Sequence, residues 1–149
     1  MVWLVNSLRA PYAAATIPKN AMQKHTPYGV GAHYPVFDPE VLGALFNHEA
    51  MVIAGVLQTF ASSISASLSE LRLAVAAQDL PRVGTLAHKI MGASHQSGAH
   101  ALGQTARSVE LCVQQGDAAG AQSAAEDLDA QWRLLQTCLD ALHQKQKCP

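Results

Sequence analysis

The stretch Ala87-His88-Lys89-Ile90-Met91-Gly92, followed closely by Gly98-Ala99, tells more about this chain than any other. Successive side chains on a helix are about 100° apart, so this segment is expected to bury one apolar face. The residues expected on that face are Leu80, Val83, Ala87, Ile90 and Ser94. His88 projects about 120° from the centre of the face and is therefore expected to point toward water or a partner.

Two glycines flank the outward histidine, Gly84 one turn before it and Gly92 one turn after it. Glycine inside a helix costs about 1 kcal/mol relative to alanine. We therefore expect both glycines to keep the space around His88 clear.

From residue 38 onward, the sequence contains residues that typically begin and end helices. Asp38, Asp79 and Asp117 are expected N-caps, and Gly98 and Gly116 are expected to end helices. Apolar residues recur every three or four positions through about residues 49–77, 80–98, 102–116 and 118–143, after a short helix over about 39–46. Because the connections are short, neighbouring helices should be antiparallel. The prediction is an all-α fold, an up-down-up-down four-helix bundle with a short additional N-terminal helix.

Residues 1–36 are rich in proline and show no sustained periodicity, which predicts an extended linker or N-terminal arm. The bundle is expected over 37–143, and residues 144–149 are expected to be a frayed tail. The apolar opening is interrupted by Asn6 and Arg9, so it is too short for a membrane span and does not resemble a signal peptide.

The composition narrows the function classes. The 149 residues are 49% hydrophobic but only 5% aromatic, and the formal net charge is −1. No basic field is available for nucleic acid or an anionic membrane surface. Cys112, Cys138 and Cys148 form no metal-binding or disulfide pattern, so we expect packing roles and a cytoplasmic location.

The residues around His88 resemble the histidine-containing phosphotransfer (HPt) family, whose pattern is roughly Ala-His-x-Leu-Lys-Gly followed by Gly-Ala or Gly-Leu. The matching positions are Ala87, His88, Ile90, Gly92, Gly98 and Ala99. Residues 37–42 resemble the start of the family's first helix, and Val109-Glu110 resembles its Leu-Glu pair. The resemblance covers about residues 37–143. One departure is Met91, where the family usually has lysine.

The resemblance implies that His88 accepts a phosphoryl group from a receiver-domain aspartate and passes it to another receiver. Neutral imidazole suits this role because its unperturbed pKa of about 6.5 leaves it largely unprotonated near neutral pH. The resemblance places Mg²⁺ in the receiver partner and implies no cofactor in this chain. An upstream histidine kinase or hybrid kinase is the other implied partner, and this chain would be a phosphoryl carrier rather than a catalyst, free-standing or the last domain of such a kinase.

Supporting roles follow from the same resemblance. Glu110 is expected to orient the His88 ring through a hydrogen bond. The remaining candidates for supporting the phosphoryl group or docking a receiver are Gly84, Lys89, Met91, Gly92 and His95.

Three alternatives remain. A binding-only relative that docks receivers without phosphate would explain the missing lysine at Met91. His95 is expected to be a rim contact or a surface residue rather than a second phosphorylation site. A metal site using His88, His95, His100 and Glu110 is disfavoured, because histidines seven residues apart are separated by about 10 Å along a helix.

Overall fold

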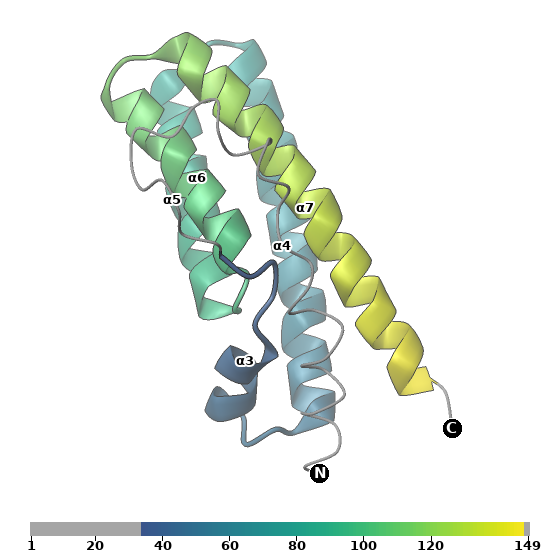
Figure 1. Ribbon diagram of the computed structural model, residues 1–149. Helices are drawn as coiled ribbons and strands as arrows, with labels where there is room; N and C mark the ends of the chain where they lie inside the picture. Colours follow the sequence, from purple (N-terminus) through teal and green to yellow (C-terminus); the bar gives the residue numbers. More distant parts are fainter. Residues whose placement is uncertain (1–33, 148–149) are drawn as a thin grey trace.

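The computed structural model describes residues 34–147, which form five helices. They are α3 (Pro39–Leu45), α4 (Ala50–Ala76), α5 (Leu80–Gln96), α6 (His100–Gln114) and α7 (Ala118–Lys147). Helices α4 to α7 alternate in direction, and the described residues contain no strand (Figure 1). The predicted four-helix bundle with a short preceding helix is confirmed. The expectations for residues 1–33 and 148–149, including Cys148, lie outside the described residues.

The helix ends follow the local chemistry of the sequence. The three predicted caps, Asp38, Asp79 and Asp117, accept hydrogen bonds from backbone amides two or three residues later at 2.8–3.2 Å. Gly98 and Gly116 end α5 and α6 with φ of 83° and 70°, the left-handed conformation that glycine adopts without steric cost. Local sequence therefore sets the boundaries of the helical hairpin formed by α5 and α6.

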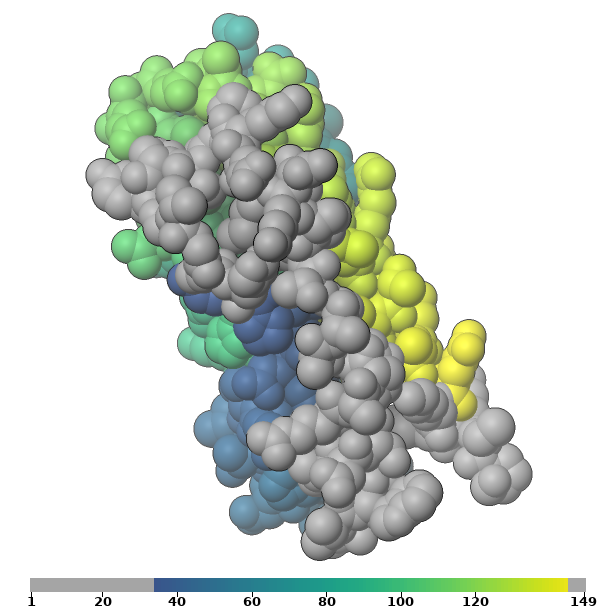
Figure 2. Space-filling model, in the orientation of Figure 1, coloured from purple at the N-terminus to yellow at the C-terminus, as the bar shows by residue number. Residues whose placement is uncertain are grey.

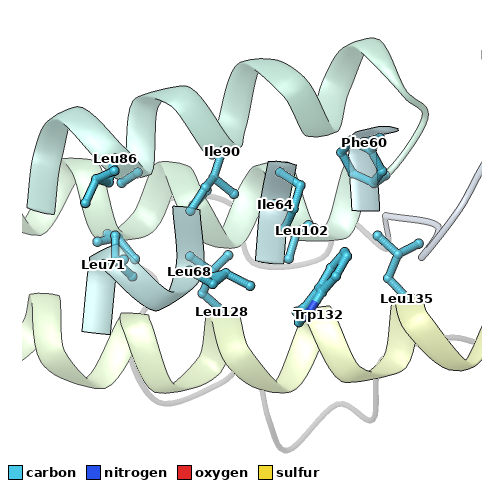
Figure 3. Packing of buried hydrophobic residues seen from close by; sticks show 14 of the residues in the cluster. Phe60, Ile64, Leu68, Leu71, Leu86, Ile90, Leu102, Leu128, Trp132 and Leu135 are labelled. Atoms are coloured by element: carbon cyan, nitrogen blue, oxygen red, sulfur yellow. The ribbon is translucent and has the colours of Figure 1, made fainter. Parts of the chain in front are cut away.

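A continuous apolar core lies between the four long helices, and Figure 3 shows its central side chains. Phe60 of α4 and Trp132 of α7 meet edge to face, with ring centroids 6.4 Å apart. The predicted apolar face of α5 is buried except that Leu80 is only half-buried, and Leu86 also joins the core. The spacing of the apolar residues therefore predicts correctly both that this segment is an α-helix and which of its faces is buried.

Residues 34–38 close over the turn between α5 and α6. The Asp38 amide donates to the Gly98 carbonyl at 2.8 Å, and the Ala101 amide donates to the Pro35 carbonyl at 3.2 Å. Val36 and Phe37 are buried. The core therefore includes Val36, one residue before the predicted start of the bundle.

Different elements lie at the two ends of the bundle. The turns between α4 and α5 and between α6 and α7 lie at one end, and α3 lies near the other, beside the first half of α4 (Figures 1 and 2). Helix α7 runs to Lys147, so the tail predicted to fray from residue 144 is helical for its first four residues.

Among the described helices, α4 is the one whose length and mean hydropathy of 1.5 would allow it to cross a membrane. Core helices of water-soluble proteins also meet that criterion. In this bundle α4 supplies side chains to the core along most of its length: Leu57, Phe60, Ile64, Ser67, Leu68, Leu71 and Ala74.

Candidate functional site

The candidate site lies along the contact between α5 and α6, the most extensive helix–helix contact in the bundle. The two helices are antiparallel, and their facing positions follow one register. A side chain added at Gly84 would meet Val113, the His88 ring contacts Glu110, and the His95 ring covers Gly103. Moving along α5 toward its C-terminus therefore corresponds to moving about the same number of residues along α6 toward its N-terminus.

His88 and Glu110 form the central pair of this edge. His88 Nδ1 lies 3.0 Å from Glu110 Oε1, and the side chains are 69% and 21% exposed, respectively. A carboxylate only accepts hydrogen bonds, so in the neutral ring Nδ1 is the protonated nitrogen and donates to Glu110. The lone pair is then on Nε2, which is the nitrogen available to an incoming electrophile.

The two glycines near His88 differ in their surroundings. A Cβ atom on Gly84 would lie 3.1 Å from Val113 Cγ1, whereas one on Gly92 would meet nothing within 4 Å. Gly84 thus allows α6 to approach α5, which differs from the expectation that both glycines clear the space around the histidine. Open space is present only at Gly92.

Met91 and Lys89 occupy different sides of α5. Met91 is half-buried and packs against the core, as expected for a boundary position. Lys89 is exposed. It is about 100° around the helix from His88, and because His88 faces α6, Lys89 is on a more outward face.

His95 does not behave as a simple surface residue. Its ring is half-buried over Gly103, with Cε1 only 2.8 Å from the position of an added Cβ atom, and its centroid is 5.9 Å from that of His100. Burial lowers the pKa of His95, and the nearby charges of His100 and Arg107 lower it further. The neutral form of this ring is therefore favoured.

Other candidate chemistry is separate from this edge. Within residues 34–147, no group of three or more histidine, cysteine, aspartate or glutamate side chains could hold a metal ion. Burial raises the pKa of both the Cys112 and the Cys138 thiols, which agrees with packing roles. A hollow of about 560 Å³ lies among α4, α5 and α7, and neither His88 nor Glu110 lines it.

Comparison with known proteins assigns the chain to a family. The family model described as the Hpt domain matches residues 55–145, which include α5, α6 and most of α4 and α7. The chain belongs to the Hpt domain family, whose members are phosphocarrier modules of phosphorelays.

A solved structure supports the same fold. The chain is similar to histidine-containing phosphotransfer protein B (HptB) from Pseudomonas aeruginosa PAO1, with a TM-score of 0.69. The two are 22% identical, and the match covers 74% of this chain and 96% of that one. A comparison with curated proteins finds no match.

The sequence identifies the residues of the central pair, but not all of their neighbours. The family resemblance predicts Glu110 beside His88, and the structure places the two side chains in contact. Sequence reasoning misses Arg107, whose charge acts on the His95 ring, although its position one turn before Glu110 on the same helix is a signal that could have found it.

Proposed function

We propose that this protein is a phosphorelay intermediate that carries a phosphoryl group on His88. The observation that supports the proposal most directly is the 3.0 Å contact between His88 Nδ1 and Glu110. This contact fixes the ring tautomer and directs Nε2 outward, while the exposed imidazole leaves room for a partner.

In the proposed transfer, Nε2 attacks the phosphorus atom of an aspartyl phosphate on a receiver domain. The Nε2–P bond forms, the P–O bond to the aspartate breaks, and the carboxylate leaves. Nδ1 keeps its proton during this step, and Glu110 accepts the hydrogen bond from it and stabilises the positive charge that develops on the ring. The reverse reaction with a second receiver would unload the phosphoryl group.

Partners and location belong to the same proposal. Receiver domains would supply Mg²⁺ together with the phospho-accepting aspartate, so this chain would contribute the nucleophile and its orienting carboxylate. An upstream histidine kinase or hybrid kinase would feed the relay, in the cytoplasm.

The binding-only alternative rests on Met91, which leaves the usual lysine position without a charge. The two functions differ in whether a covalent phosphohistidine forms. Receiver docking without phosphate on this chain would support the alternative.

The test is incubation of the protein with a phosphorylated receiver and detection of acid-labile, base-stable phosphate. We expect labelling of the natural chain and complete loss in His88→Gln. Because His88 is largely exposed, the substitution should change the free energy of unfolding by about 0.5 kcal/mol or less. The melting temperature should therefore change little. The matched control is His95→Gln, which should retain labelling. Loss of labelling only in the His95 variant would contradict the proposal.

A further inference from the structure

A phosphoryl group on His88 would create a local excess of negative charge. Glu110 already places a carboxylate within hydrogen-bonding distance of the same ring. A phosphoryl group adds oxygens with close to two negative charges, and phosphoryl transfer depends strongly on neutralising them. Met91 cannot do so, so a cation from elsewhere is needed.

Two arginines of the bundle already form ion pairs with carboxylates other than Glu110. Arg82 forms an ion pair with Glu70 at 3.1 Å, and Arg72 forms one with Asp129 at 2.8 Å. Lys89 is exposed but lies about 100° around α5 from His88. None of these three faces the contact between α5 and α6.

Arg107 does face this contact. The register that pairs His88 with Glu110 and His95 with Gly103 places Arg107 midway, opposite Met91. Arg107 is exposed, and no carboxylate within residues 34–147 pairs with it. Its charge also acts on the ring of His95, which agrees with this placement.

We infer that Arg107 binds the phosphoryl oxygens on His88 and supplies from α6 the positive charge that Met91 does not supply from α5. Arg107 and Glu110 are three residues apart on α6, so they are neighbours on one face. One helical turn spans 5.4 Å, a distance that the flexible stem of an arginine can bridge. The guanidinium can donate two parallel hydrogen bonds to phosphoryl oxygens. This inference rests on the proposed function of His88.

The test uses phosphoramidate as a small donor, so that receiver docking makes no contribution. His88 Nε2 would form a bond to phosphorus, the P–N bond of phosphoramidate would break, and ammonia would leave. The rate of phosphohistidine formation is measured by phosphate-sensitive gel shift or ³¹P NMR. We expect Arg107→Gln to lower this rate about fivefold, the effect of a partly exposed charge contact of about 1 kcal/mol.

Three further variants separate direct binding by Arg107 from a general effect of surface charge. Lys89→Gln tests the competing cation on α5 and should lower the rate less than Arg107→Gln does. Arg107→Lys should retain part of the rate, because it keeps the charge but loses the planar fork. Adding Met91→Lys to Arg107→Gln should restore the rate, since a lysine stem can run along the bundle from this boundary position.

The outcomes are distinct. Equal rates for the natural protein and Arg107→Gln would overturn the inference, as would a larger loss in Lys89→Gln. A natural protein that takes no phosphoryl group from either phosphoramidate or a phosphorylated receiver would overturn the proposed function itself, and the inference with it. Circular dichroism melting of each variant would verify that the fold is unchanged.

Discussion

The contact between α5 and α6 and the contact between α4 and α7 are built in opposite ways. Small residues let α5 and α6 approach closely, and Gly84 and Gly103 each lie against a side chain of the facing helix. Among the neighbouring pairs of long helices, α4 and α7 have the least extensive contact, and they diverge toward the C-terminus of α7 (Figure 1). Large side chains, Phe60 and Trp132 among them, fill the space between them (Figure 3).

This difference separates two tasks within one bundle. Close packing fixes the register in which His88 meets Glu110, because backbones in near contact cannot slide without collision. The wider contact buries large apolar surface and so contributes mainly to stability. Substitutions in the two regions should therefore affect different measurements.

The largest expected effect is on stability, from Trp132→Ala between α4 and α7. Trp132 is 5% exposed, and removing a buried aromatic side chain costs about 3–5 kcal/mol. Below the lowered melting temperature, the folded protein should still form phosphohistidine at the natural rate. Leu134→Ala is the control on the same helix, because that side chain is 42% exposed. A changed phosphorylation rate in folded Trp132→Ala would show that the two regions are coupled.

A smaller loss is expected from Gly98→Ala at the turn between α5 and α6. Gly98 has φ of 83°, and an added Cβ atom would collide with the Asp38 carbonyl, so we expect a loss of about 2–4 kcal/mol. Gly116→Ala is the matched control, since it has a similar φ but nothing within 4 Å of its added Cβ atom. Its loss should be only about 1–2 kcal/mol. Equal chemical denaturation curves for the two variants would mean that residues 34–38 can shift to accommodate the added Cβ atom at little cost in free energy.

The smallest effect concerns pH. The pKa of His95 is lowered in the folded state by burial and by the charges of His100 and Arg107. The unfolded chain then binds more protons, so stability is retained above the unfolded pKa of about 6.5 and falls as pH drops below it. Denaturation at pH 7 and pH 5 should show a smaller loss for His95→Gln than for the natural protein. An identical pH dependence in the two proteins would contradict this role of His95.

The elements of the fold could be predicted because their signals are local. Asp38, Asp79 and Asp117 mark helix starts, and Gly98 and Gly116 mark ends, through hydrogen bonds and backbone angles within a few residues. The burial of Val36 could not be predicted in this way. It depends on the packing of its segment over a turn about 60 positions later in the sequence.

The candidate site also contains some features that local sequence determines and others that depend on how helices pack. The outward placement of His88 follows from the spacing on α5 alone. Its contact with Glu110 was accessible only through resemblance, because it depends on how two helices are aligned. The role of Gly84 in packing against Val113 and the proximity of His95 to His100 also require that alignment.

The separation of His88 and Glu110 by only 22 residues has a consequence for how the protein folds. Both belong to one hairpin of consecutive helices, and contacts between sequence neighbours incur little loop-closure entropy. Chains dominated by such short-range contacts fold quickly, whereas contacts between α4 and α7 must wait for the intervening chain. We therefore expect the histidine and its carboxylate to meet early in folding, before the long helices enclose the core.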